Sequence, residues 1–197
     1  MPEFPSIAVF CGSQRGIRPE YAEAARHVGR LLAERDLGLV YGGGRVGLMG
    51  VVADAALGAG GRVLGVIPEA LALKEVAHSG CSELIVVPGM HERKALMAQR
   101  SSAFLTLPGG VGTYEEFFEI LSWAVLGLHR KPIGLLNVDG YFDPLLALLE
   151  HAVAERFVRP DHMRLILVSD SPDDLIAALA EFEAPPPGPK WIDLNET

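Results

Sequence analysis

Short apolar runs alternate with longer amphipathic stretches along almost the whole chain. The apolar runs, each predicted to form a β-strand, cover Ile7–Phe10, Gly38–Tyr41, Arg62–Ile67, Glu83–Val87, Ala103–Leu107, Ile133–Asn137 and Leu165–Val168. Several of these runs are continuously apolar, as expected for parallel strands that are covered on both faces. The alternation predicts a single-domain α/β fold, a doubly wound parallel sheet with helices on both faces.

The stretches between the strands carry helical patterns. In Pro19–Arg35 one face gathers Ala25, Val28, Leu31 and Leu32. Asp143–Arg156 begins with an aspartate that we interpret as a helix cap, followed by proline at the first helical position. Ser171 and Asp174 have the spacing of a capped helix start. Phe117–Leu128 is apolar nearly all round, which predicts deep burial or a subunit interface and favours an oligomer.

Length and composition fit one globular domain. The chain has 197 residues, 49% hydrophobic and 21% charged. We interpret residues 1–182 as the folded domain and 183–197 as a proline-rich tail, in which Trp191 and Ile192 suggest docking on the surface. The net charge of −8 argues against a nucleic-acid partner, whose binding face would be basic. A small-molecule site is the better expectation.

The sequence also bears on compartment. No apolar run approaches the roughly 20 residues that span a bilayer, and no basic segment precedes the first apolar run, so we expect neither a membrane span nor a secretory signal. The two cysteines, Cys11 and Cys81, are too few for a disulfide framework. Both lie in or beside apolar segments, which predicts buried, reduced thiols and a cytoplasmic protein.

Four strand ends carry residues suited to chemistry, and ligands of open parallel sheets bind beyond such ends. They read CGSQRG (11–16), YGGGRVGLMG (41–50), MHERKALM (90–97) and LTLPGGVGTYEEFFEI (105–120). Two of these segments, YGGGRVGLMG and LTLPGGVGTYEEFFEI, contain a glycine-rich turn before a helix. Such a turn suits an anion, although each of the two taken alone is equally well a tight structural turn. Neither turn matches the dinucleotide fingerprint or a P-loop. A mononucleotide phosphate is therefore favoured over a dinucleotide or ATP.

Charged residues in two of these segments admit two interpretations each. Arg93 and Lys94 are either a solvated basic patch or the partners of an anion, because cations at a helix start oppose the helix dipole. Thr113 and Glu116 have the spacing of a capping box, the structural interpretation. The functional alternative points Glu116 into the pocket as a catalytic carboxylate. Glu115 is expected to face outward or to form a local ion pair.

The segment PGGVGTYEE fits the pattern P-G-G-x-G-T-x-x-E, and it follows MHERKALM and YGGGRVGLMG in order. With these motifs the chain resembles, from about Ile7 to Val168, the Lonely Guy (LOG) family of cytokinin-activating nucleoside 5′-monophosphate phosphoribohydrolases. The resemblance implies a Rossmann-like fold, a homodimer or higher homo-oligomer with the site near the interface, and no redox cofactor. It implies cleavage of an adenosine 5′-monophosphate, often N6-substituted, into free base and ribose 5-phosphate.

The resemblance also implies roles for individual residues. Arg93 and Glu116 match the catalytic pair. The substrate-binding positions are Gly12, Ser13, Gly43, Gly44, Glu75, Lys94, Pro108, Gly109, Gly110, Val111, Gly112 and Thr113. Glu75 falls where plant members have a substrate-contacting glutamate, and Gln14 departs from the usual Gly-Ser-Ser of the first loop. No metal is expected. Some members carry the label lysine decarboxylase, which four lysines and a chain short for a pyridoxal phosphate fold do not support.

Two other functions remain as alternatives. A non-catalytic nucleotide or cofactor carrier on the same fold would need the glycine loops but would have no use for the Glu116 carboxylate. A phosphate-ester hydrolase would need a metal cluster, and no His/Asp grouping has ligand spacing. For glycosidic cleavage, Glu116 would stabilise positive charge on the ribose or deprotonate water, and Arg93 would orient the ribose or phosphate. The sequence names no acid for the leaving base.

Overall fold

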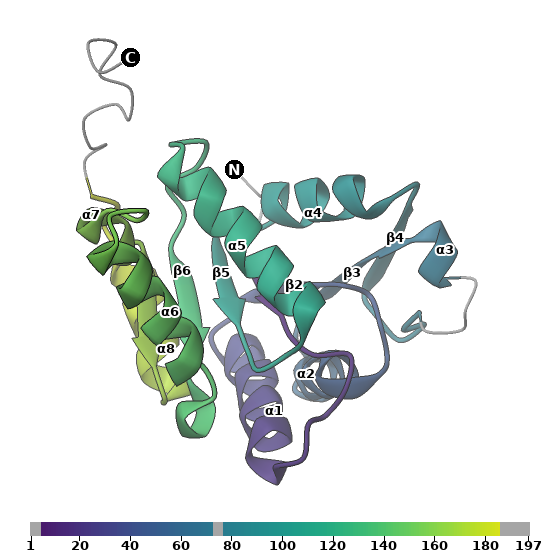
Figure 1. Cartoon of the computed structure of the whole chain (residues 1–197). Coiled ribbons are helices and arrows are strands. Elements are labelled where there is room, and N and C mark those ends of the chain that lie inside the picture. Colours follow the sequence, from purple (N-terminus) through teal and green to yellow (C-terminus); the bar gives the residue numbers. More distant parts are fainter. Residues whose placement is uncertain (1–4, 73–76, 186–197) are drawn as a thin grey trace.

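The computed structural model describes residues 5–72 and 77–185, and in them seven parallel strands form one sheet in the order β4-β3-β2-β1-β5-β6-β7 (Figure 1). The strands are β1 (Ser6–Phe10), β2 (Gly38–Tyr41), β3 (Val63–Pro68), β4 (Glu83–Val87), β5 (Ala103–Thr106), β6 (Ile133–Leu136) and β7 (Ile166–Ser169). Both ends of every predicted strand are confirmed to within one residue, and β1, β2, β5 and β6 are buried along their whole length.

Helices cover both faces of the sheet, so the predicted doubly wound α/β fold is confirmed (Figure 1). The helical elements are α1 (Pro19–Glu34), α2 (Gly47–Gly58), α3 (Glu69–Leu71), α4 (Met90–Gln99), α5 (Val111–Val125), η2 (Val138–Gly140), α6 (Asp143–Ala154), α7 (Pro160–Met163) and α8 (Pro172–Glu181). Alternate residues of β1 serve two cores: Ile7 and Val9 pack with α1, α2 and α8, whereas Ala8 and Phe10 pack with α4, α5 and α6.

The two helix starts predicted from caps have different outcomes. Ser171 caps α8 as predicted, since its hydroxyl accepts a hydrogen bond from the Asp174 N–H at 3.3 Å. The predicted aspartate cap of α6 is wrong: Phe142 precedes the helix and Asp143 is its first residue. Asn137 accounts for the difference. Its side chain accepts from the Phe142 N–H and donates to the Asp143 carboxylate at 2.7 Å, so the preceding loop sets the helix start.

The burial predicted for helix α5 and for the two cysteines is found only in part. On α5 one face is buried in the protein's own core through Phe117, Ile120 and Leu121, whereas Leu126 and Leu128 just beyond its end are 66% and 69% exposed. Cys11 is buried and Cys81 is partly exposed, and both are free thiols. The prediction of burial is wrong for Cys81 because this residue precedes β4, the edge strand of the sheet.

Some expectations fall partly or wholly outside the described residues. Trp191, Ile192 and Glu75 all lie there. In the part of the chain that the structure describes, no helix is both long and apolar enough to cross a membrane.

The order of the strands places the candidate site. The chain winds outward from β1 through β2, β3 and β4, and then returns to add β5 on the other side of β1. The loops after β1 and β5 therefore open side by side at the carboxyl ends of neighbouring strands, toward the lower edge in Figure 1. A reversal of this kind is where open α/β sheets bind ligands.

Candidate active site

The loops that follow β1 and β5 touch through their backbones. The Gly12 N–H donates to the Pro108 carbonyl oxygen at 3.0 Å. A Cβ on Gly109 would lie 2.1 Å from Oγ1 of Thr113 and 2.8 Å from the nitrogen of Gly12, so only glycine fits this contact. The predicted substrate-binding positions Gly12 and Gly109 are thus brought together, with Pro108 buried beneath them.

The start of α5 is exposed beside this contact. Gly110 precedes the helix as its cap residue, and Gly110, Val111 and Gly112 all face solvent, Val111 with 84% of its surface exposed. The first N–H groups of a helix have no acceptor within the helix, and together with the helix dipole they favour an anion. The predicted glycine turn therefore presents a free helix start to solvent.

The capping-box interpretation of Thr113 and Glu116 is wrong. The helix begins at Val111, so Thr113 is already inside its first turn, and no side chain caps the helix start. Thr113 is only 4% exposed and lies against Gly109. The chain enters the helix at Val111, two residues before the Thr113 that the capping-box spacing puts at the helix start. Glu116 is consequently too far along α5 to reach back to the helix start.

Glu116 instead faces Arg93 from α4. Nη2 of Arg93 lies 3.3 Å from Oε1 of Glu116, and their side chains are only 10% and 8% exposed. Nε of Arg93 also donates to the Val66 carbonyl oxygen at the end of β3, at 3.2 Å. The solvated-patch interpretation of Arg93 is wrong, because the residue is buried. The two residues matched to the catalytic pair are confirmed as neighbours.

The surroundings of Glu116 set its proton affinity. Burial raises the pKa of Glu116 to about 7, because a charged carboxylate is poorly solvated there, while the charge of Arg93 opposes the shift. Glu115 and Glu119 push the pKa of Glu116 further up, and Lys94 pulls it down. The thiol of Cys11 has a raised pKa through burial first and the charge of Glu116 second. Glu116 can therefore accept or release a proton near neutral pH.

Lys94 lies between two other carboxylates of α5. Its ammonium forms ion pairs with Glu115 and, at 3.0 Å, with Glu119, and its side chain is 8% exposed. Burial by itself would lower the pKa of Lys94, but the hydrogen bonds to Glu115 and Glu119 raise it overall. Glu115 is half exposed and paired, as expected, although its partner lies on another helix. The substrate contact of Lys94 stays a prediction.

The glycines of the loop after β2 contact two different parts of the chain, residues 77–78 and Arg93. Gly43 has a positive φ of 72° and its carbonyl accepts from the His78 N–H at 2.8 Å, and Gly44 pairs with Ala77. Gly42 lies against Arg93 instead, because a Cβ there would meet the guanidinium. Gly42 was not predicted to be a site residue. The signal was present, since it is the first glycine of the GGG run after the strand.

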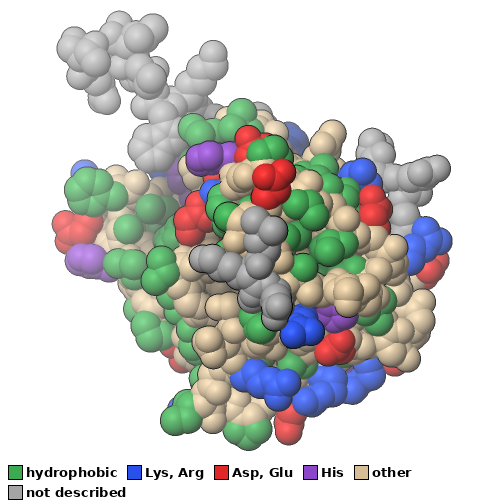
Figure 2. Space-filling view, turned by 90° about the vertical axis from the view of Figure 1, so that its right-hand side faces the viewer, with side chains coloured by type: hydrophobic (Ala, Val, Ile, Leu, Met, Phe, Trp, Pro, Cys, Tyr) green, Lys and Arg blue, Asp and Glu red, His purple; other side chains and the backbone are tan. Residues whose placement is uncertain are grey.

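The first loop reaches the start of α2. Ser13 is exposed, and a Cβ on Gly47 would lie 2.2 Å from the carbonyl carbon of Ser13. Arg15, Arg18 and Arg45 are exposed in the loops after β1 and β2. Figure 2 shows several Lys and Arg side chains gathered along the lower edge of one face. The overall charge of −8 therefore coexists with a locally cationic edge.

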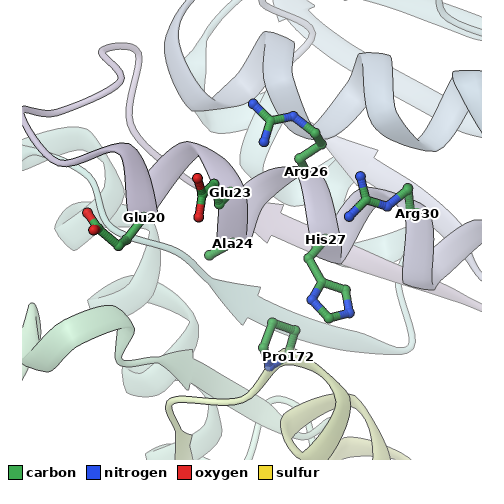
Figure 3. A pocket seen from close by; sticks show the side chains of 7 residues that line it. All are labelled: Glu20, Glu23, Ala24, Arg26, His27, Arg30 and Pro172. Carbon is green, nitrogen blue, oxygen red and sulfur yellow. The ribbon is translucent and has the colours of Figure 1, made fainter.

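A shallow hollow lies apart from these loops, between α1 and the start of α8 (Figure 3). The ring of His27 points toward Pro172 across it, and His27 also pairs with Asp173 at 3.0 Å. Arg35 reaches the same carboxylate at 3.5 Å, so this region joins the two helices. Within residues 5–72 and 77–185, no group of three or more His, Cys, Asp or Glu residues could hold a metal ion.

Solved structures share this fold at low sequence identity. The molybdenum cofactor binding protein from Rippkaea orientalis superimposes with a TM-score of 0.70 at 22% identity, over 91% of this chain and 97% of its own. The Moco carrier protein from Chlamydomonas reinhardtii gives a TM-score of 0.68 at 21% identity, over 91% and 97% of the two chains. At such identities the likeness establishes the architecture alone.

Sequence comparisons identify the family. The family profile described as "Possible lysine decarboxylase" matches residues 49–179. A cytokinin riboside 5′-monophosphate phosphoribohydrolase of Rhodococcoides fascians is 51% identical over 179 residues, which cover 90% of each chain. A protein of that name from Arabidopsis thaliana is 49% identical over 180 residues, 91% of this chain and 83% of its own. With these matches and the paired Arg93 and Glu116, the chain belongs to the LOG family.

Proposed function

We propose that this protein hydrolyses the N-glycosidic bond of adenosine 5′-monophosphate or its N6-substituted forms, releasing free base and ribose 5-phosphate. The observation that carries the proposal is the buried Arg93–Glu116 pair beside the contacting glycine loops. Relatives named for this activity are about half identical to the chain over nine tenths of its length.

The phosphate of the substrate has a site in the exposed start of α5. Gly110, Val111 and Gly112 are exposed there, and the N–H groups of a helix start suit an anion. The exposed arginines of the loops after β1 and β2, Arg15, Arg18 and Arg45, add positive charge at this end of the sheet. A nucleotide held by its phosphate at this point has its ribose within reach of side chains one turn further along α5, which is where Glu116 lies.

The chemistry falls to Glu116. As the bond from the anomeric carbon to the base nitrogen breaks, positive charge develops on the ribose, and a nearby carboxylate stabilises that charge. The electron pair of the broken bond stays on the base nitrogen, which takes up a proton as the free base forms. The Glu116 carboxylate can accept the proton that the attacking water loses as the new carbon–oxygen bond forms, and a pKa of about 7 suits that transfer near neutral pH. Arg93 fixes the carboxylate by its ion pair and is itself fixed by the Val66 carbonyl.

A direct assay tests the proposal. The protein is incubated with AMP and with N6-isopentenyl-AMP, and free base and ribose 5-phosphate are measured. We expect both products from at least one substrate, and we expect Glu116→Gln to abolish turnover while nucleotide binding persists. Glu115→Gln, the same change on the neighbouring half-exposed carboxylate, serves as the matched control and keeps most of the turnover.

Two results contradict the proposal. If neither substrate yields products although the nucleotide binds, the protein is a carrier, the alternative that the glycine loops alone would serve. If Glu116→Gln turns over at the wild-type rate, Glu116 has no part in the chemistry.

We also propose a cytoplasmic homodimer with no nucleic-acid partner. The free thiols of Cys11 and Cys81 fit a reducing compartment, and the net charge of −8 disfavours nucleic acid.

Leu126 and Leu128 expose apolar surface at the end of α5, which a second copy would cover. Light scattering after gel filtration should give twice the mass of one chain, and the double change Leu126→Glu with Leu128→Glu should give a single-chain mass. A single-chain mass for the wild type contradicts the dimer.

A further inference from the structure

One tyrosine hydroxyl joins the two ends of the glycine turn. Tyr141, which follows η2, donates a hydrogen bond to the Gly109 carbonyl oxygen, and its own oxygen lies 2.8 Å from the hydroxyl of Tyr114. A carbonyl oxygen can only accept, so the single proton of Tyr141 goes to Gly109 and Tyr114 donates to Tyr141. Gly109 before the helix and Tyr114 in the first turn of α5 are thereby held to the same atom.

The ring of Tyr141 is held in its turn by aromatic neighbours. The Tyr21 ring of α1 meets it edge to face, with centroids 5.4 Å apart at 75°, and Phe142 does so at 5.0 Å and 85°. Phe142 is only 1% exposed, so this support belongs to the core. Tyr21 also lies under the first loop, because a Cβ on Gly16 would be 2.6 Å from its ring. Tyr141 therefore contacts the 109–112 turn directly and is linked to the first loop through the ring of Tyr21.

The glycine turn has little other restraint on its exposed side. A Cβ on Gly110 or on Gly112 would meet no atom within 4 Å, so neither residue is packed against a neighbour. Glycine loses more conformational freedom on ordering than any other residue, so an unsupported turn of this composition would populate many shapes. Among the described residues, the turn is restrained by the Tyr114 N–H, which donates to the Gly110 carbonyl at 3.0 Å, and by contacts at its base with Gly12, Thr113 and Tyr141.

We propose that Tyr141 is a positioning residue, whose hydroxyl holds the 109–112 turn in the shape that binds the substrate phosphate. The inference rests on the proposed function for the identity of the ligand. It extends that function to a side chain from the loop after β6, which lies within residues 49–179 that match the family profile but has no role assigned by the resemblance. Burial, with the hydrogen bond from Tyr114 adding to it, raises the pKa of Tyr141 to about 12, so the hydroxyl keeps its proton across the physiological range.

The test removes one oxygen and keeps the ring. Tyr141→Phe is compared with Tyr21→Phe, a control in which the ring contact persists and the lost hydroxyl has no hydrogen-bond partner among the described residues. Binding of ribose 5-phosphate is measured by calorimetry, and amide exchange over residues 109–115 by mass spectrometry. We expect Tyr141→Phe to weaken the binding of ribose 5-phosphate by about tenfold, the equivalent of one lost hydrogen bond. Amide hydrogen exchange over residues 109–115 should become faster. The control should change neither measurement.

The outcomes separate this inference from the proposed function, because ribose 5-phosphate binding needs no turnover. Unchanged affinity and exchange in Tyr141→Phe overturn the positioning role even if AMP is hydrolysed. An equal loss in Tyr21→Phe overturns it too, as does a wild-type protein that fails to bind ribose 5-phosphate. If the wild type binds ribose 5-phosphate and Tyr141→Phe weakens it, the role of Tyr141 holds even when AMP is not cleaved.

Discussion

Nη2 of Arg93 occupies the space in which a side chain on Gly42 would begin, since a Cβ on Gly42 would lie 1.8 Å from that nitrogen. The residue after β2 must therefore be glycine if the guanidinium is to stay where it meets both Glu116 and the Val66 carbonyl. The contact ties the end of one strand to the charge pair on two helices.

Gly42→Ala should therefore impair the reaction with little effect on folding. Gly42 does not have a positive φ, so alanine fits the backbone, but its methyl group displaces the guanidinium. A misplacement of about 1 Å can cost about 100-fold, the loss we expect in kcat/KM for AMP. Gly58→Ala is the control, since a Cβ there meets open space, and its kcat/KM should match the wild type. An unchanged kcat/KM in Gly42→Ala would show that the position of the guanidinium is unimportant.

The pH dependence of the reaction should report the ionisation of Glu116. If the carboxylate is the active form, kcat/KM rises with pH and levels off above a midpoint near the Glu116 pKa of about 7. Glu115→Gln should move the midpoint down, because Glu115 raises the pKa of Glu116. The substrate phosphate also titrates, but its pKa is the same for both proteins. A midpoint that stays fixed in Glu115→Gln would assign the limb to the substrate.

Stability should depend on pH through the same group. Because the pKa of Glu116 rises from 4.5 to about 7 on folding, the folded protein binds its proton more tightly than the unfolded chain. This contribution is fully present below pH 4.5 and is lost as pH rises through about 7. Glutamine resembles the protonated acid at all pH values. Urea unfolding should show Glu116→Gln gaining stability over the wild type from pH 4.5 to about 7, and a pH-independent difference would exclude this linkage.

Replacing Lys94 should destabilise the fold, because its ammonium pairs with the carboxylates of Glu115 and Glu119. Lys94→Met leaves Glu115 and Glu119 close together without a cation, and Oε2 of Glu119 is already buried without a partner in the described part of the chain. Removing one side of a buried ion pair costs about 3 kcal/mol or more, and the exposure of Glu115 moderates the loss to roughly 2 kcal/mol. Adding Glu119→Gln should recover part of it in urea unfolding. Additive losses would show that the charges do not interact.

Local patterns predicted the elements of the fold well, because buried parallel strands are continuously apolar and glycine marks the turns. The apolar runs located each strand to within one residue, and the segments that follow β1, β2, β4 and β5 were predicted as the places for chemistry. The order of strands in the sheet was not predicted. That order depends on how α4 and α5 pack, which no local pattern encodes.

The same limit applies to the site. Arg93 and Glu116 were paired by resemblance, whereas their 3.3 Å contact follows from the placement of α4 beside α5. The capping-box spacing of Thr113 and Glu116 was misleading because the helix begins at Val111, so that Thr113 lies inside its first turn. Gly42 was missed because its neighbour, Arg93, is distant in the sequence and close only in the fold.

The pairing of β1 with β5 has a consequence for how the protein is made. Ile7 lies beside Ala103, and the Ser102 hydroxyl donates to the Ser6 carbonyl across 96 positions of the chain. Closing so long a loop is entropically costly and slow, and it cannot happen before β5 has left the ribosome. The β1 and β5 loops meet only after that closure. A nascent chain that ends before β5 therefore lacks the proposed phosphate site, and nucleotide binding by that site would report that the centre of the sheet has assembled.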